Sequence, residues 1–314
     1  MPYPSDRIHL DWDTLPPPGK DHTGQDVYQV FHQYPSLKIL YPFEWESKWN
    51  EGGAASSWAG DNMHIAYVLV TLYVLLVFGV QWHMKDKDRV DAKSAWKWWN
   101  LGLSIFSFCG AARTVPHLIS SLLHPDRGFK HTVCYPASEH YGYGACGLWT
   151  MLFIFSKIPE LFDTAFIVLL KAKLIFLHWY HHITVLLYCW HSYGTRNAAG
   201  LWFISMNYSV HAIMYFYYFI SQYYPKGKTP CAFFVTSVQI SQMFVGVVIC
   251  FFTWFFKSRD ETCSVTWENW RAGLLMYLSY FGLFVSFAIN RYCACSRRKG
   301  EEKTMNKDEK KKRD

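Results

Sequence analysis

The stretch Lys-Ile-Pro-Glu-Leu-Phe-Asp-Thr, residues 157–164, decides how the chain folds, because it places a lysine and two carboxylates inside an apolar run from residue 145 to 170. Charged side chains are costly in hydrocarbon, so ionisable groups inside a membrane usually pair or face a cavity, and they usually have a function. A second polar cluster, His-Trp-Tyr-His-His at residues 178–182, lies in the next apolar run. Together the two clusters predict an active site within a lipid bilayer.

Apolar runs of similar length recur along the chain. Of its 314 residues, 51% are hydrophobic, and polar residues concentrate near the two ends. A helix needs about 20 apolar residues to cross hydrocarbon. The predicted spans are residues 64–83, 98–123, 145–170, 174–192, 198–223, 230–256 and 270–290. A large soluble helical protein is the alternative, but such runs with short polar breaks are typical of membrane proteins. We therefore predict an all-α polytopic membrane protein with seven transmembrane helices.

The distribution of Lys and Arg indicates the orientation. The loops and tail on the side of the C-terminus carry 19 of these residues, and the opposite side carries 10. The positive-inside rule then places the C-terminus in the cytosol and the N-terminus in the lumen. We expect an irregular lumenal arm at 1–63, a seven-helix domain at 64–292 and a disordered basic tail at 293–314. The net charge of +7 comes largely from this tail, so we expect no binding to nucleic acid.

Two of the nine cysteines, Cys134 and Cys263, fall in predicted lumenal loops. Disulfides persist in oxidising compartments such as the lumen of the endoplasmic reticulum. The sequence therefore predicts a disulfide between these two residues, with Cys146, near a span boundary, as the alternative partner.

Helical geometry gathers the polar residues of the third span onto one face. At about 100° per residue they lie within an arc of about 120°. They are Lys157, Glu160, Asp163 and Thr164. Pro159 lacks a backbone donor and is expected to kink the span. A structural salt bridge between Lys157 and Glu160 is an equally good interpretation, and it does not exclude catalysis nearby.

The next three spans carry polar faces of their own. The residues of these faces are His178, His181 and His182; Asn207, His211 and Tyr215; and Thr236, Gln239 and Gln242. Three histidines within five residues favour function over packing, whereas amides in a membrane also join helices. At about 1.5 Å of rise per residue, the polar groups lie in the cytosolic halves of their spans or near the midplane. A cavity with a polar cytosolic mouth and an apolar closed end suits a substrate with a charged head and a long hydrocarbon tail.

The polar faces form four motifs that resemble those of the fatty-acid elongases, the ELO family of membrane 3-ketoacyl-CoA synthases. The motifs are Lys-x-x-Glu-x-x-Asp-Thr at 157–164, His-x-x-His-His at 178–182, Asn-x-x-x-His-x-x-Met-Tyr-x-Tyr-Tyr at 207–218 and Thr-x-x-Gln-x-x-Gln at 236–242. They occur in the family's order, and the resemblance covers about residues 40–293. Each motif alone is weak, but their joint occurrence is highly specific.

The resemblance implies an enzyme, an acyltransferase that condenses long-chain acyl-CoA with malonyl-CoA to 3-ketoacyl-CoA, CO2 and CoA. This is the first step of fatty-acid elongation in the endoplasmic reticulum membrane. The resemblance also implies seven helices that enclose an acyl tunnel. Trp179, which follows the first histidine of the motif, resembles the residue found in elongases of saturated and monounsaturated chains. Elongases of polyunsaturated chains more often have Val at this position. Acyl-CoA and malonyl-CoA are substrates, so no cofactor and no NADPH site is expected. The expected partners are membrane lipid, the reductases and dehydratase of the cycle, and a second copy of the chain.

No cysteine lies within the polar motifs, so an imidazole is the expected nucleophile, because it can carry an acyl group. Our assignment for the acyl carrier is His181, with His211 beside it. The other two histidines of the cluster, His178 and His182, would orient groups or transfer protons. Amide groups would donate hydrogen bonds to the enolate formed when malonyl-CoA loses CO2; they belong to Asn207, Gln239 and Gln242. The expected substrate-binding residues are Lys157, Glu160, Asp163, Thr164, Tyr215, Gln239 and Gln242.

Two other kinds of protein share part of this pattern. A di-iron membrane desaturase or hydroxylase also has a His-x-x-His-His box, but it needs further histidine boxes, and among 14 histidines this chain has one adjacent pair, His181–His182. We therefore expect no metal site. A seven-helix receptor would not explain polar faces at one depth.

The chain also ends with Lys311-Lys312-Arg313-Asp314, which resembles a cytosolic dilysine signal for retrieval to the endoplasmic reticulum.

Overall fold

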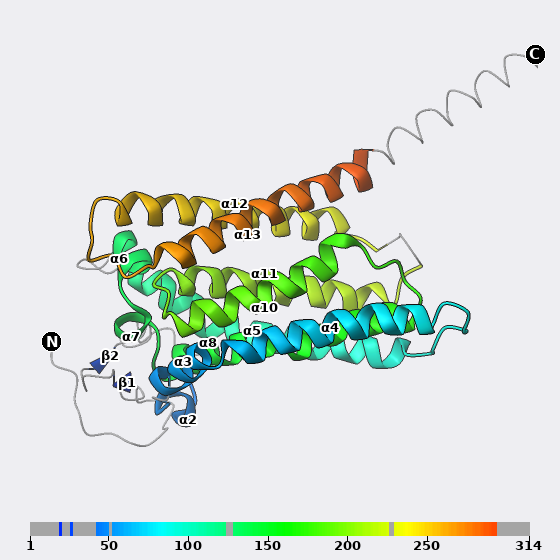
Figure 1. The fold of residues 1–314 in the computed structure, drawn as a ribbon, viewed down its shortest axis with the longest axis horizontal. Helices are drawn as coiled ribbons and strands as arrows, with labels where there is room; N and C mark the ends of the chain where they lie inside the picture. The colour runs from blue at the N-terminus through cyan, green and yellow to red at the C-terminus, as the bar shows by residue number, and fades with distance from the viewer. Residues whose placement is uncertain are drawn as a thin grey trace, which may run out of the picture.

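The computed structural model describes residues 19–20, 26–27, 42–49, 52–123, 128–225 and 229–293, and most of them are helical (Figure 1). The longer helices are α4 (Met63–His83), α5 (Lys93–Leu123), α8 (Gly144–Ser156), α10 (Phe176–Gly194), α11 (Gly200–Ser221), α12 (Ala232–Lys257) and α13 (Trp267–Ala288). The shorter ones are α2 (Glu44–Ser47), α3 (Gly52–Asp61), α6 (Gly128–Cys134), α7 (Ala137–His140), η2 (Pro159–Leu161), α9 (Phe162–Leu169) and η3 (Ile289–Cys293). Two two-residue antiparallel strands, β1 (Gly19–Lys20) and β2 (Asp26–Val27), complete the described elements.

Each predicted span coincides with one to three of these helices, so the all-α class is confirmed. Within the described residues, three helical segments are long and apolar enough to cross a membrane: Met63–His83, Ala232–Lys257 and Trp267–Tyr292. The remaining spans are less apolar or shorter, because α10 and α11 carry the histidine and asparagine motifs and because α8 and α9 are separate short helices. Seven crossings therefore stay a prediction.

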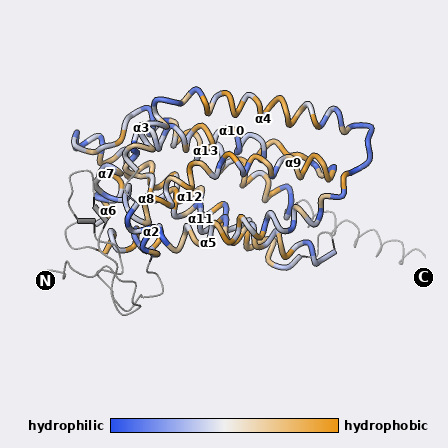
Figure 2. The backbone as a smooth tube through the Cα atoms, turned by 90° about the horizontal axis from the view of Figure 1, so that it is seen from below, coloured by the Kyte–Doolittle hydropathy of each residue, from blue (hydrophilic) through white to orange (hydrophobic). Residues whose placement is uncertain are grey.

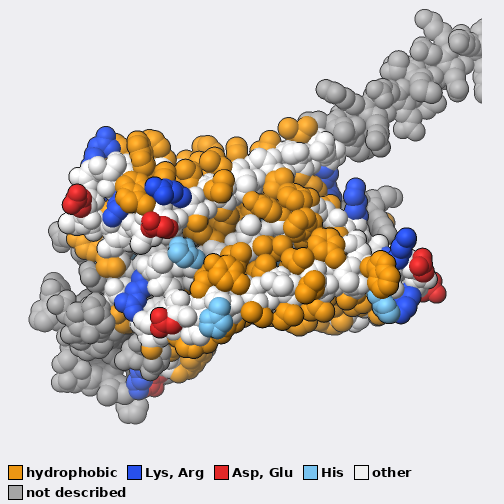
Figure 3. Space-filling view, in the orientation of Figure 1, with side chains coloured by type: hydrophobic (Ala, Val, Ile, Leu, Met, Phe, Trp, Pro, Cys, Tyr) orange, Lys and Arg blue, Asp and Glu red, His pale blue; other side chains and the backbone are white. Residues whose placement is uncertain are grey.

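The surface of the helices is apolar where a bilayer would contact it. The hydrophobic residues lie along the middle of the helices, whereas hydrophilic residues gather at the connections (Figure 2). In the space-filling view, charged side chains are found at the two ends of the molecule and apolar side chains cover the face between them (Figure 3). On α4 the exposed large residues include Leu72, Leu75 and Leu76. Exposed apolar surface of this extent marks a membrane contact, and the chain is embedded in a membrane.

Helix α10 lies at the centre of the bundle and contacts α3, α4, α8 and α13, while α5 packs along α11 and α12 along α13. Small residues allow the closest of these approaches, as in other membrane bundles. A Cβ atom added at Gly110 of α5 would lie 2.3 Å from the Tyr208 ring of α11. Because α10 touches so many neighbours, its polar residues can meet those of several other helices.

The expectation of an irregular arm at 1–63 is wrong for its last part, where α2 and α3 form. The Glu46 carboxylate of α2 is buried and accepts hydrogen bonds from Arg113 of α5, at 3.0 Å between Nη2 and Oε2. Helix α3 packs on α10, where the Trp190 indole donates to the carbonyl of Ala59 at 2.7 Å. These contacts come from distant parts of the sequence, so tertiary packing, and not the local pattern, stabilises the two helices.

The structure pairs Cys134, at the end of α6, with Cys263, in the connection between α12 and α13, with an S–S distance of 2.05 Å. These are the two cysteines that were expected to pair. The alternative partner, Cys146 of α8, is a buried free cysteine. The basic tail at 294–314, including Lys311 and Lys312, lies outside the described residues.

Candidate active site

The motif at 157–164 lies where a helix is interrupted. Helix α8 ends at Ser156, the 3-10 turn η2 runs from Pro159 to Leu161, and α9 begins at Phe162. Proline cannot donate a backbone hydrogen bond, and its ring clashes with the carbonyl four residues earlier. The predicted kink at Pro159 is therefore a full break, and it places Lys157 and Glu160 on a tight turn inside the bundle.

Lys157 and Glu160 form a buried ion pair. The Lys157 Nζ atom lies 2.7 Å from Oε1 and 2.9 Å from Oε2 of Glu160, and the two residues are 2% and 3% exposed. The ammonium also donates to Asn207 Oδ1 at 3.3 Å, and Ser156 Oγ donates to Glu160 Oε1 at 2.9 Å. The pair thus joins the α8–α9 break to α11, as a structural salt bridge would.

Asp163 is held by two neutral donors from other helices. The Trp99 indole of α5 donates to Oδ1 and the Tyr215 hydroxyl of α11 donates to Oδ2, each at 2.6 Å. Both carboxylate oxygens are therefore occupied, as a buried carboxylate requires. Trp99 belongs to none of the four motifs, so its contact with Asp163 was not predicted.

Thr164 connects the carboxylate motif to the histidine motif. Its Oγ1 atom lies 3.0 Å from Nε2 of His178 and 2.7 Å from the hydroxyl of Tyr73 on α4. The resulting series Tyr73–Thr164–His178 fixes the orientation of the first imidazole. The His178 ring also lies 4.6 Å from the ring of His182, measured between centroids.

His181 is placed differently from its two neighbours. Its ring stacks on Tyr280 of α13, with 4.9 Å between centroids and 27° between planes. The Tyr280 hydroxyl donates to the backbone carbonyl of His181 at 3.2 Å. Within the described part of the chain, no hydrogen bond engages the His181 imidazole nitrogens, whereas His178 is tied to Thr164. The stacked ring is oriented while its nitrogens stay available.

A cavity with an empty volume of about 1090 Å³, including space open to solvent, brings most of the predicted residues together. We call it the outer cavity. Its lining includes Glu160, Asp163, His178, His181, His182, Asn207, His211, Tyr215, Gln239 and Gln242. The other two predicted residues, Lys157 and Thr164, lie behind this lining and support it. Across the cavity, His211 Nδ1 lies 3.9 Å from Glu160 Oε2.

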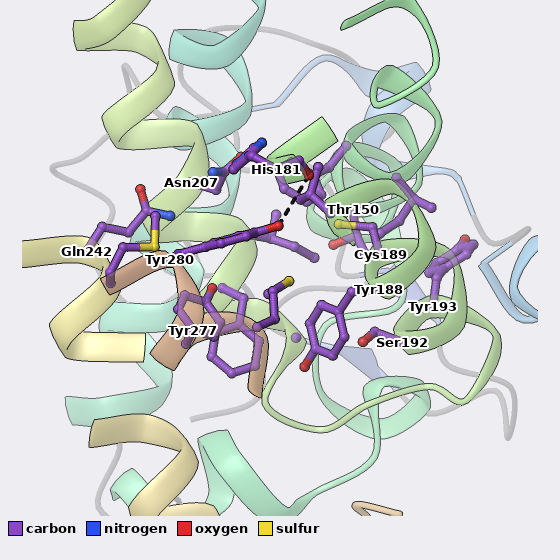
Figure 4. A pocket seen from close by; sticks show the side chains of 18 of the residues that line it. Thr150, His181, Tyr188, Cys189, Ser192, Tyr193, Asn207, Gln242, Tyr277 and Tyr280 are labelled. Carbon is purple, nitrogen blue, oxygen red and sulfur yellow. Dashed lines mark hydrogen bonds between the residues drawn. The ribbon is translucent and has the colours of Figure 1, made fainter. Parts of the chain in front are cut away.

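A second, mostly apolar cavity, with an empty volume of about 610 Å³ including space open to solvent, shares part of its lining with the outer one. We call it the inner cavity. Its walls include Phe153, Val185 and Phe203. The residues that line both cavities are His181, Asn207, Gln242 and Met243. The close-up shows His181 and Asn207 near each other, with the Tyr280 side chain pointing toward His181 and with Tyr188 and Tyr193 farther away (Figure 4). His181 therefore stands between a polar space and an apolar one.

Sequence reasoning missed three residues that hold the site: Tyr73, Trp99 and Tyr280. Each is an aromatic residue in an apolar helix, and no motif distinguishes it from the many others. Of the residues on the α12 face, Gln239 donates to Met214 Sδ at 3.1 Å, whereas the Thr236 hydroxyl bonds within α12 and to Tyr292. In the described residues, no group of three or more His, Cys, Asp or Glu is arranged to hold a metal ion.

Comparison with known proteins identifies the family. The model of the ELO family (GNS1/SUR4 family) matches residues 58–302. The chain is 38% identical over 265 residues to "Fatty acid elongase 3" of Trypanosoma brucei brucei, covering 77% of this chain and 88% of that protein. It is 39% identical over 261 residues to "Very long chain fatty acid elongase 6" of Gallus gallus and 38% identical over 257 residues to the protein of that name from Homo sapiens, each match covering 82% of this chain and 95% of the relative. The family match and these relatives confirm what the four motifs predicted: the chain belongs to the ELO family.

Proposed function

We propose that this chain is a fatty-acid elongase, an acyltransferase that condenses a long-chain acyl-CoA with malonyl-CoA to give 3-ketoacyl-CoA, CO2 and CoA. Family membership and the elongase relatives support the activity. The observation that carries the mechanism is the position of His181, which lines both the polar outer cavity and the apolar inner cavity. An acyl-CoA thioester likewise joins a polar CoA group to an apolar chain at its carbonyl carbon. We therefore place that carbon at the junction of the two cavities.

The proposed reaction has two half-reactions. In the first, an imidazole nitrogen of His181 attacks the thioester carbonyl, the carbon–sulfur bond breaks, and CoA leaves as a thiol with the imidazole proton. The acyl-imidazole holds the chain in the inner cavity. In the second, malonyl-CoA loses CO2 to form an enolate, whose carbon attacks the acyl carbon. The bond from the acyl carbon to the imidazole nitrogen breaks, and the imidazole regains a proton that His211 relays from solvent, so the whole reaction takes up one proton. No electrons are gained or lost overall, so the reaction needs no redox cofactor.

The neighbouring groups suit the charges that develop. An enolate oxygen requires oriented donors in a space without competing water. The amides of Asn207 and Gln242 lie at the junction, and Gln239 lines the outer cavity. We assign the proton transfers to His211 and the orientation of the substrate to His178 and His182. The carboxylate side of the cavity, Asp163 with Tyr215, would position the bound CoA ester.

The cellular setting of this proposal follows from the sequence. We propose seven crossings around an acyl tunnel, a cytosolic C-terminus, a lumenal N-terminus and residence in the endoplasmic reticulum, where the disulfide of Cys134 and Cys263 faces an oxidising compartment. Trp179 supports a preference for saturated and monounsaturated chains. The reductases and dehydratase of the cycle, and a second copy of the chain, are the proposed partners.

Intact-mass analysis of the purified enzyme tests the acyl carrier. Wild-type enzyme incubated with acyl-CoA alone should gain the mass of one acyl group, and His181→Ala should not. His191→Ala on the same helix is the matched control, because His191 lines neither cavity, and Cys189→Ala excludes the nearest thiol. An undiminished adduct in folded His181→Ala would remove this residue from the role of nucleophile.

A further inference from the structure

The inner cavity shares part of its lining with a third cavity. This third cavity has an empty volume of about 390 Å³, including space open to solvent, and is lined by polar and small residues of α3, α7, α8, α10 and their connections, including Ser56 and Arg196. Four residues line both the inner cavity and this third cavity, and each carries a hydroxyl group: Tyr141, Thr150, Ser192 and Tyr193. We call these four residues the hydroxyl wall. The apolar cavity is thus closed by polar groups.

The hydroxyl wall stands at a definite distance from His181. Ser192 follows His181 by eleven positions on α10, a rise of about 16 Å. Figure 4 shows Tyr188, Ser192 and Tyr193 at the end of the cavity away from His181 and Asn207. An extended chain advances about 1.2 Å per bond, as three backbone bonds cover about 3.6 Å. A chain attached at His181 therefore reaches the wall after roughly thirteen bonds.

Two members of the wall are fixed by hydrogen bonds. The Tyr141 hydroxyl donates to the carbonyl of Asn197 at 2.5 Å, and Ser192 Oγ accepts from Asn269 Nδ2 at 2.8 Å. A Cβ atom at Gly200 would lie 2.2 Å from the Tyr141 hydroxyl. Glycine at this position is what lets Tyr141 close against the start of α11.

The other two members have buried hydroxyl groups that are not paired. Thr150 Oγ1 and Tyr193 Oη are buried, and neither has a hydrogen-bond partner among the residues that the structure describes; Thr150 is only 2% exposed. Buried hydroxyls are nearly always paired, with protein or with water. These two therefore indicate a ligand that can hydrogen-bond, at the end of a cavity built for hydrocarbon.

We propose that the hydroxyl wall recognises the chemical group at the far end of the acyl chain. It stops a methyl-ended chain that fills the inner cavity, and it accepts a chain of the same length that ends in a hydroxyl group. A methyl group at the wall displaces water from Thr150 and Tyr193 without replacing its hydrogen bonds, whereas a terminal hydroxyl replaces them. The substrate class is acyl-CoA with an oxygen at the terminal carbon. This inference rests on the proposed condensation and adds its specificity.

Condensation rates over a ladder of saturated acyl-CoAs, with methyl or terminal hydroxyl ends, test the proposal. At the longest length that still reacts, wild-type enzyme should use the hydroxylated chain about tenfold faster, a ratio typical of one misfitted group in a pocket. The double variant Thr150→Val with Tyr193→Phe removes both unpaired hydroxyls at nearly constant volume. It should abolish that preference by raising the rate for the methyl-ended chain of the same length.

Controls separate this inference from the proposed activity. Thr253→Val removes a buried hydroxyl that is already bonded, to the carbonyl of Ile249 at 2.8 Å, and should keep the wild-type ratio and limit. A short chain that cannot reach the wall should be condensed equally by all variants, which also shows that they fold. No condensation of any chain would defeat the proposed function instead. Equal wild-type use of both chain ends, or an unchanged ratio in the double variant, would overturn the role of the wall.

Discussion

Removing both charges of the Lys157–Glu160 pair should cost less stability than the two single removals added together. Lys157 Nζ makes two hydrogen bonds to the Glu160 carboxylate, at 2.7 and 2.9 Å, and both side chains are almost fully buried. Breaking such a pair from one side leaves an uncompensated charge, at a cost of about 3–5 kcal/mol. At about 2–4 °C per kcal/mol, Lys157→Met or Glu160→Gln should lower the Tm by roughly 6–20 °C.

The double variant Lys157→Met with Glu160→Gln removes the charge imbalance, so its loss of Tm should be smaller than the sum of the two single losses. Contacting residues typically show coupling of about 0.5–3 kcal/mol. Thermal melting of the purified enzyme, followed by tryptophan fluorescence, measures all four members of the cycle. Lys130→Met is the control, because it breaks the exposed ion pair with Asp260, and such pairs contribute at most about 1 kcal/mol.

The same variants decide whether the pair also acts in catalysis. Condensation is measured at a temperature where every variant is folded. If the pair contributes only structure, the double variant should regain activity as it regains stability. If the site needs the charges, the double variant stays inactive although it is stable. Additive losses in Tm would refute the reasoning from burial, because they would show that the two charges do not compensate each other.

The other predictions concern separate parts of the molecule. Cys134→Ser opens a link between residues 129 positions apart, so it should lower the stability by up to about 5 kcal/mol; melting should show this, and Cys231→Ser, at an exposed free cysteine, should melt as wild type does. Tyr215→Phe removes a hydrogen bond to a buried carboxylate, worth about 1.5–3 kcal/mol, so kcat/KM should fall at least about tenfold; an unaltered value would contradict a positioning role. Lys311→Ser with Lys312→Ser should let part of the protein reach the Golgi, as microscopy would show, unless the spans themselves retain it.

Most of the candidate site could be predicted because its residues lie at helical spacing within apolar runs. Spacing of three or four residues groups polar side chains on one face whatever the neighbours are. Pro159 marks a point where a helix cannot continue, although the sequence predicts a kink and the structure has a break. The joint occurrence of the four motifs then predicted membership of the ELO family, which the comparisons confirm.

The remainder depends on contacts that no local pattern encodes. Tyr280 and Tyr73 are ordinary aromatic residues of apolar helices until packing places them against His181 and Thr164. The segment Gly52–Asp61 is rich in small residues and has no apolar periodicity, so its helix is apparent only from its packing against α10. The hydroxyl wall brings together residues from three separated segments, and only the folded chain shows that they close one cavity.

The most exposed helix of the bundle is also tied to the first imidazole. In α4 only Ala66, Tyr73 and Val77 are buried, yet the Tyr73 hydroxyl bonds Thr164, which bonds His178. The 21 residues of α4 extend about 31 Å, close to the roughly 30 Å of a bilayer's hydrocarbon core, and a helix tilts when that thickness changes. We therefore expect a change in bilayer thickness to alter the rate of condensation through this contact. Tyr73→Phe removes the hydrogen bond to Thr164, and it should make the rate less sensitive to lipid length.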